Sequence, residues 1–130
     1  MIVVDASALV AIGDDEPDAD RFLEILERTA SCISAVNYVE TGLILIGRGR
    51  LATQEDLDDW LRRLGVQVTP DENLSATALG AYLVYGRRYH PARLNLADCF
   101  AYALAKSLDA PLLYKGDDFP LTDVRSALDA

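Results

Sequence analysis

Acidic side chains occupy positions in this sequence where an unpaired charge is costly. Asp5 ends a short apolar segment, Glu40 interrupts an apolar helical stretch, Asp98 lies near the start of another, and Asp117 and Asp118 follow a third apolar segment. A carboxylate in apolar surroundings loses its hydration, so it needs a cation, a hydrogen-bond donor or a proton. Carboxylates that gather at one place also repel one another. These residues therefore predict a shared cation site.

The composition indicates which cation would suit that site. The chain has only two lysines to offset the acids, His90 is its only histidine, and Cys32 and Cys99 lie far apart. This excludes the usual zinc patterns, which need clustered histidines or cysteines. Ligation by oxygen alone favours Mg²⁺ or Mn²⁺.

Each acid also has a structural alternative. Asp5 could cap the helix that follows it, and Asp98 could cap another, although Asn95 is better placed as an N-cap. Glu40 could pair with a buried arginine, and the aspartates after Gly116 could form an ordinary turn. The occurrence of all these acids in this order favours a common site.

Short apolar segments alternate with helical patterns along the whole chain. We expect strands at residues 2–5, 31–34, 66–68 and 111–114, and helices near 35–47, 53–64, 72–87 and 94–107. Two further helices are expected, one beginning near Ser7 and one after the turn at residues 14–17, with Phe22, Leu23 and Leu26 on its buried face. This alternation predicts a single α/β domain over residues 1–130, with a mostly parallel sheet flanked by helices. Ligands of such sheets bind beyond the carboxyl ends of the strands, where Asp5 and Asp117–Asp118 are expected.

Length and charge exclude several classes of protein. The chain has 130 residues and a formal net charge of −9, with 51% hydrophobic residues. It is neither disordered nor membrane-spanning, and its overall charge does not suit a protein that binds nucleic acid over its whole surface. The absence of a signal-peptide pattern and of a disulfide pattern indicates a cytoplasmic protein.

A local basic and aromatic segment is compatible with RNA. Guanidinium groups bind phosphates, and a tyrosine ring stacks on a base. Lys115 could contact phosphate or only offset Asp117. A hydrolytic triad of Ser7, His90 and an aspartate is disfavoured, because no nucleophile elbow is present. The possible RNA-binding rim consists of Arg87, Arg88, Tyr89, His90 and Arg93. Lys115 is a further candidate for RNA binding outside this segment. The alternative is a solvated loop without a ligand.

The ordered motifs resemble those of PIN-domain ribonucleases of the VapC toxin type. They are V-V-D-A-S-A-L around Asp5, S-A-x-x-x-x-E ending at Glu40, N-x-x-D from Asn95 to Asp98, and K-G-D-D-F from Lys115. The resemblance covers essentially the whole chain. It implies a PIN-like three-layer sandwich and a catalytic, metal-binding quartet of Asp5, Glu40, Asp98 and Asp118. It also implies supporting roles for Ser7, Asn95 and Thr122, while Asp117 is the less secure neighbour of Asp118.

The same resemblance implies a function and partners. We expect an Mg²⁺-dependent endoribonuclease that acts as the toxin of a toxin–antitoxin pair, forms a homodimer, and is neutralised by a small antitoxin protein. Two alternatives stay open. A haloacid-dehalogenase-like phosphatase would need a second aspartate where Ser7 stands. A noncatalytic receiver-type magnesium-binding module would need an adjacent acidic pair near the first strand and a central phospho-acceptor.

Overall fold

The central sheet consists of short strands that all run in the same direction. The computed structural model describes residues 1–129, and its strands are β1 (Ile2–Val4), β2 (Ser31–Ser34), β3 (Val66–Thr69) and β4 (Leu112–Leu113). They form a 4-stranded sheet in the order β3-β2-β1-β4, and each neighbouring pair is parallel. Every residue of β1, β2 and β4 is buried, as expected for strands covered on both faces.

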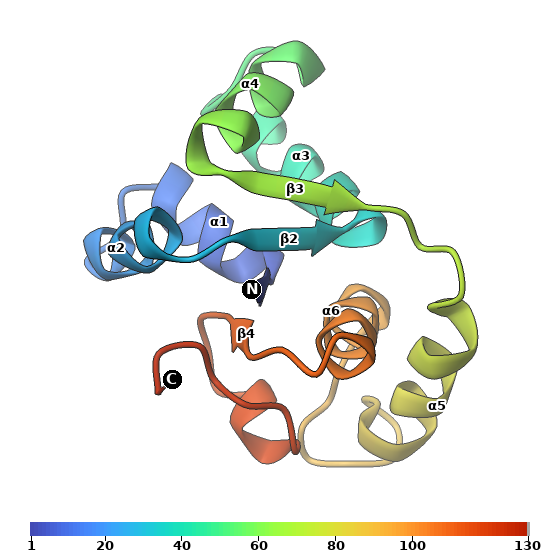
Figure 1. The fold of residues 1–130 in the computed structure, drawn as a ribbon. Coiled ribbons are helices and arrows are strands. Elements are labelled where there is room, and N and C mark those ends of the chain that lie inside the picture. Colours follow the sequence, from blue (N-terminus) through green and yellow to red (C-terminus); the bar gives the residue numbers. More distant parts are fainter. Residues whose placement is uncertain (130) are drawn as a thin grey trace.

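Helices cover the sheet in two layers, and a short 3-10 helix follows β4 (Figure 1). The helices are α1 (Ala6–Gly13), α2 (Ala19–Arg28), α3 (Ala35–Gly47), α4 (Gln54–Leu64), α5 (Ser75–Tyr85) and α6 (Leu96–Ser107), and the 3-10 helix is η1 (Phe119–Leu121). One buried cluster joins α5 and α6 to the sheet, and another joins α1, α2 and α4 to it. The predicted three-layer α/β arrangement is therefore confirmed.

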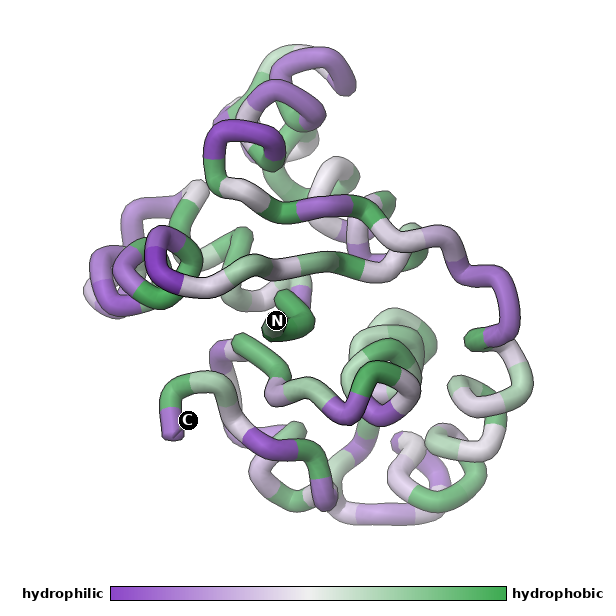
Figure 2. The backbone as a smooth tube through the Cα atoms, viewed as in Figure 1, coloured by the Kyte–Doolittle hydropathy of each residue, from purple (hydrophilic) through white to green (hydrophobic). Residues whose placement is uncertain are grey.

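Hydropathy follows the layers (Figure 2). The strands are mostly apolar, whereas α2 and α4 carry many hydrophilic residues on their outer sides. In α4, Leu57 and Leu61 are buried, and the helix begins with the expected capping box between Thr53 and Asp56. None of the helices in residues 1–129 has the length and apolar character that crossing a membrane requires.

Some boundaries differ from the sequence-based expectation. The helix expected at 72–87 is shorter, because Asn73 adopts a left-handed φ of 71° and helical structure starts only at Ser75. The strand expected at 111–114 is reduced to Leu112–Leu113. Pro111 has no N–H to donate, although its carbonyl accepts a hydrogen bond from the Val3 amide (3.0 Å).

The strand order brings the first and last strands together. The chain proceeds from β1 outward through β2 to β3, and then returns to place β4 on the other side of β1. In Figure 1 the N-terminus accordingly lies between β2 and β4. The crevice at such a reversal of strand order is where open parallel sheets bind ligands. Asp5 and the loop after β4 both lie at this edge.

Candidate active site

Asp5 is a buried carboxylate at the carboxyl end of β1. Its backbone amide donates to the carbonyl of Leu113 in β4 (2.8 Å), and its Oδ2 accepts from the Ser7 amide (3.0 Å). Asp5 thus caps α1, as the structural alternative predicted. Its other oxygen, Oδ1, is buried without a hydrogen-bond partner. Burial raises the pKa of Asp5 to about 6, despite the opposing hydrogen bonds from Ser7. Capping therefore accounts for only one of its two oxygens.

Glu40 enters from α3, whose first turn is anchored by buried polar groups. Ser34 caps the helix by accepting from the Asn37 amide (3.1 Å), and the side chains of Ser34 and Asn37 are hydrogen-bonded to each other. The Asn37 amide group also donates to the carbonyl of Ala97 (3.0 Å), which ties α3 to the start of α6. Burial and the charge of Asp98 raise the pKa of Glu40, and Asn37 lowers it.

Asp98 lies in the first turn of α6. Asn95 is the N-cap, and its side chain accepts from the Asp98 amide (2.9 Å), while Asp98 Oδ2 accepts from the Asn95 amide (3.0 Å). Burial, followed by the charges of Asp5 and Asp118, raises the pKa of Asp98 to about 6, and Arg87 lowers it. The two capping residues considered in the sequence are thus halves of one capping box.

The loop after β4 carries Asp117 and Asp118, both exposed. Gly116 has a φ of 114°, a conformation that side chains other than glycine rarely adopt, and η1 begins after Asp118. Asp118, not Asp117, is among the charges that raise the pKa of Asp98. Thr122 ends η1, donating to the Phe119 carbonyl (2.8 Å), so its hydroxyl shapes this turn.

The acids influence one another across the sheet edge. Glu40 raises the pKa of Asp5, Asp98 raises that of Glu40, and Asp118 raises that of Asp98. Among residues 1–129, however, His, Cys, Asp and Glu side chains form no ready-made group of three or more that could hold a metal ion. The unpartnered Oδ1 of Asp5 and the oxygen-only donor set fit a hard divalent cation.

Ser7 and Lys115 connect the start of α1 to the loop after β4. The backbone amide of Lys115 donates to Ser7 Oγ (2.9 Å), while Ser7's own amide binds Asp5. The Lys115 ammonium does not face the acids of the site. It pairs with Glu16 and with Asp18 in the turn between α1 and α2.

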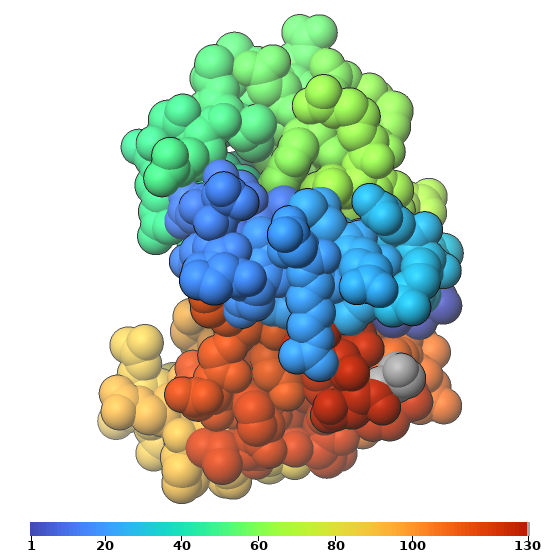
Figure 3. Space-filling model, turned by 90° about the vertical axis from the view of Figure 1, so that its left-hand side faces the viewer, coloured from blue at the N-terminus to red at the C-terminus, as the bar shows by residue number. Residues whose placement is uncertain are grey.

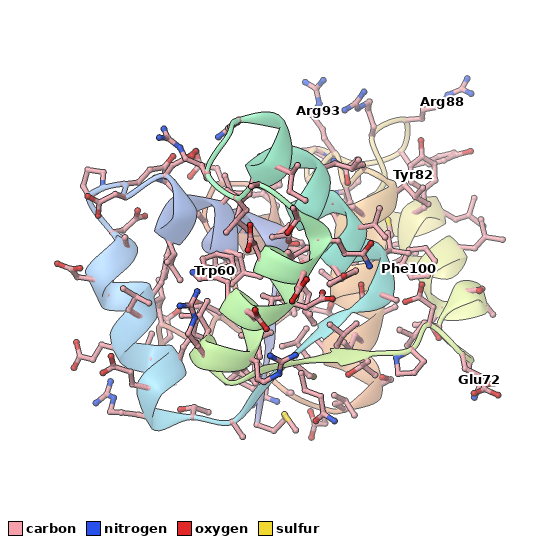
Figure 4. The ribbon with its side chains drawn as sticks, turned by 90° about the horizontal axis from the view of Figure 1, so that it is seen from above. Trp60, Glu72, Tyr82, Arg88, Arg93 and Phe100 are labelled. Carbon is pink, nitrogen blue, oxygen red and sulfur yellow. The ribbon has the colours of Figure 1, made fainter. Side chains whose placement is uncertain are left out.

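The rim segment follows α5. Gly86 ends this helix so tightly that a Cβ there would lie 2.3 Å from the Tyr82 carbonyl oxygen. Arg88 and Arg93 point away from the body of the protein (Figure 4). Seven of the chain's lysines and arginines make ion pairs in residues 1–129, and Arg87, Arg88 and Arg93 are not among them.

The rim's aromatic residues are held by neighbouring rings. Tyr89 is 57% exposed and meets Tyr82 edge-on at a centroid distance of 5.9 Å. His90 packs against Tyr85 (5.0 Å), and its Nδ1 accepts from the Ala92 amide (3.0 Å). One histidine nitrogen is therefore already used in shaping the loop, which disfavours the triad with Ser7 further.

Sequence reasoning missed Asn37. It is fully buried, although asparagine is rarely found so deep in a protein. Its position three residues before Glu40 on an apolar helix was a usable signal, since residues at that spacing share a helix face. The contact with Ala97 could not be inferred, because it joins segments 60 residues apart.

The chain resembles known proteins over nearly its full length. A family model described as PIN domain matches residues 2–124. The chain is 42% identical to VapC ribonuclease Mb0640 of Mycobacterium bovis over 95% of each protein. It is 45% identical to ribonuclease VapC42 of Mycobacterium tuberculosis over 97% of this chain and 98% of that protein.

The chain belongs to the VapC ribonucleases of the PIN-domain family. It is thus a nuclease of the hydrolase class that acts on RNA. The crystal structure of M. tuberculosis VapC20, described as a sarcin-ricin loop cleaving toxin, has the same fold. It matches with a TM-score of 0.71 and 18% sequence identity over 96% of this chain and 99% of that one. Membership of the VapC ribonucleases leaves the phosphatase and receiver alternatives without support.

Proposed function

We propose that this VapC ribonuclease is an Mg²⁺-dependent endoribonuclease toxin whose metal is held by Asp5, Glu40, Asp98 and Asp118. The observation that carries the proposal is the buried, unpartnered Oδ1 of Asp5 at the carboxyl end of β1. A buried carboxylate oxygen without a donor is costly, so its presence calls for a cation. The charges of Asp98 on Glu40, and of Asp5 and Asp118 on Asp98, which raise the pKa values of Glu40 and Asp98, support the same location.

The chain's own residues have distinct parts in this proposal. Asp5 offers Oδ1 because the Ser7 amide occupies Oδ2, and Asp98 offers its second oxygen because Oδ2 caps α6. A divalent ion held by these residues would supply polarisation of the scissile phosphate and a lowered pKa for a coordinated water. With their pKa values raised to about 6, Asp5 and Asp98 would have to lose any bound proton before they could hold the ion.

The RNA is proposed to lie along the rim of Arg87, Arg88, Tyr89, His90 and Arg93. The three arginines are free of intramolecular ion pairs in the described residues, so their guanidinium groups are available to phosphates. The exposed ring of Tyr89 offers a surface for a base. A local rim of this kind reconciles an RNA substrate with a net charge of −9.

The proposed partners are a small antitoxin and a second copy of the chain. Large apolar side chains are exposed on α3, where Leu43 is 73% exposed, and at α6, where Leu96 is 71% exposed. A groove of about 470 Å³ beside Leu43 is lined mostly by apolar residues of α3, together with Gln54 and Leu57 of α4. Sedimentation of the purified chain tests the homodimer.

The protein is proposed to be cytoplasmic. Its two cysteines, Cys32 and Cys99, are buried and form no disulfide, which suits a reducing compartment.

The direct test is cleavage of defined RNAs by the wild type, Asp5→Ala and Asp98→Asn in the presence of Mg²⁺. We expect cleavage by the wild type, its loss in excess EDTA, and its loss in both variants. Equal cleavage by all three proteins, or full activity in EDTA, would refute the proposed site. Internal cleavage of a circular RNA distinguishes an endonuclease from an exonuclease.

A further inference from the structure

The loop that carries Asp118 is fastened to the N-terminal part of the chain at two points. Its backbone is held where the Lys115 amide donates to Ser7 Oγ (2.9 Å). Its side chain is held where the Lys115 ammonium pairs with Glu16 and with Asp18, the latter at 3.2 Å. Figure 3 shows the corresponding surfaces in contact, with α1 and α2 in blue against the orange C-terminal segment.

The side chains of Glu16 and Asp18 make no ion pair in residues 1–129 other than those with Lys115. Asp18 stands at the N-cap position of α2 but makes no side-chain capping hydrogen bond, and Glu16 lies in the turn before it. Both pair with Lys115 rather than with an arginine of their own segment. Hydrogen bonds from the ammonium to Glu16 and to Asp18 raise the pKa of Lys115, which favours its charged form.

The contacts of Lys115 matter because few other contacts fix the loop of residues 115–118. Lys115–Asp118 are exposed, and Gly116, with its left-handed φ, lies between Lys115 and the two aspartates. Phe119 anchors the far side by packing against Tyr114 at a centroid distance of 5.2 Å. On the near side, the contacts of Lys115 are the ones that link the loop to α1 and the turn after it.

We propose that Lys115 is a positioning residue, whose ion pairs with Glu16 and Asp18 hold the Asp118 loop against the turn after α1 and thereby raise the site's affinity for a divalent ion. This inference rests on the proposed metal site. It replaces the interpretation of Lys115 as an RNA contact, because its ammonium is engaged with two carboxylates. It also assigns a task to Glu16 and Asp18 outside the proposed quartet.

The two roles for Lys115 predict opposite effects when the acids, rather than the lysine, are changed. In the double variant Glu16→Gln with Asp18→Asn, a positioning lysine loses its partners, so the loop should loosen as it does in Lys115→Ala. An RNA-contacting lysine would instead be released, and RNA binding would strengthen. Lys115→Arg keeps the charge. The matched control is Glu24→Gln, which removes a carboxylate from an exposed α2 pair with Arg28.

Two measurements on the full chain test the proposal without RNA. Hydrogen exchange reports the Lys115 amide that is bonded to Ser7, and calorimetry with Mn²⁺ reports metal affinity. We expect Lys115→Ala and the double acid variant to exchange this amide faster and to bind Mn²⁺ about threefold to tenfold more weakly, the range for a few exposed ion pairs. Lys115→Arg and Glu24→Gln should match the wild type within about twofold.

Each outcome has a definite meaning. Wild-type Mn²⁺ affinity in both Lys115→Ala and the double acid variant would overturn the inference, even if the amide exchanged faster. Stronger RNA binding by the double acid variant would overturn it in favour of an RNA contact. If the wild type bound no Mn²⁺, or if Asp5→Asn bound Mn²⁺ as tightly as the wild type, the proposed metal site itself would be wrong.

Discussion

Asn95 and Asp98 each cap the backbone of the other at the start of α6, through hydrogen bonds of 2.9 and 3.0 Å. The same carboxylate has a pKa raised to about 6 by burial and by the charges of Asp5 and Asp118. One oxygen of Asp98 therefore caps α6, while the negative charge of the same carboxylate contributes to the proposed metal site. These two roles can be separated by substitution.

Asp98→Asn should abolish activity while sparing the fold. The amide oxygen of asparagine can still accept the Asn95 hydrogen bond, so we expect the free energy of unfolding to fall by less than about 1 kcal/mol. RNA cleavage should fall by about 100-fold or more, because loss of a proposed ligand should exceed the roughly 10- to 100-fold cost of losing an outer-shell partner. Urea unfolding and single-turnover cleavage measure the two effects.

Asp56 in α4 provides the matched control, because it forms the same capping box with Thr53 away from the proposed site. Asp56→Ala removes one hydrogen bond of this box, so it should cost about 0.5–1.5 kcal/mol of stability and leave cleavage unchanged. If Asp98→Asn cleaved RNA as well as Asp56→Ala does, Asp98 would be a capping residue only.

Without metal, the protein should be more stable at pH 5 than at pH 7.5. The pKa of Asp5 is raised from 3.8 to about 6, so the folded state binds more protons than the unfolded state between these values. The resulting stability is fully present below pH 3.8 and is lost as the pH rises through about 6. For Asp5 alone the loss from pH 5 to 7.5 is about 1 kcal/mol.

Urea unfolding in EDTA at both pH values measures this change, and Asp5→Asn should reduce it. An Asp5→Asn variant with the same pH dependence as the wild type would show that Asp5 does not titrate in this range.

Added Mg²⁺ or Mn²⁺ should raise the melting temperature at pH 7.5, because a ligand that binds only the folded state stabilises it. At a metal concentration about 100 times the Kd, the gain is about 2.7 kcal/mol. The gain should shrink at pH 5, where protons on Asp5 and Asp98 compete with the ion. Thermal scans at the two pH values measure it. If metal raised the melting temperature of Asp5→Asn as much as that of the wild type, the ion would not be bound by Asp5.

Removing a rim arginine should weaken RNA binding and flatten its dependence on salt. For single-stranded RNA, each phosphate contact contributes about 0.7 to the slope of log Kobs against log salt. Arg88→Ala and Arg93→Ala should each lower the slope by about that amount in metal-free binding assays. Arg63→Ala is the control, because Arg63 also lacks an ion pair but belongs to α4. If all three variants lost binding equally, the proposed rim would be wrong.

The sequence predicted the local elements best where side-chain chemistry marks their ends. Strand β2 and helix α3 match the expected residues, because Ser34 both ends the strand and caps the helix. The Thr53–Asp56 capping box was also confirmed. Helix α5 was predicted too long, because the left-handed turn at Asn73 leaves no mark in the hydrophobic pattern.

The candidate site could be predicted as residue types but not as contacts. Assignment of the quartet stays a prediction. The structure adds that the charge of Glu40 raises the pKa of Asp5, that of Asp98 raises the pKa of Glu40, and those of Asp5 and Asp118 raise the pKa of Asp98. The pairing of Lys115 with Glu16 was not predictable, because 99 residues separate them and only the placement of β4 beside β1 brings them together.

The position of β4 also links enzyme activity to the order of protein synthesis. The β1 strand is made before the other strands of the sheet, whereas its neighbour β4 and the loop with Asp118 are made after them. A chain still being translated can form β1, β2 and β3 yet lacks one wall of the proposed site. The proposed site is therefore incomplete until residue 118 has been synthesised and β4 has paired with β1.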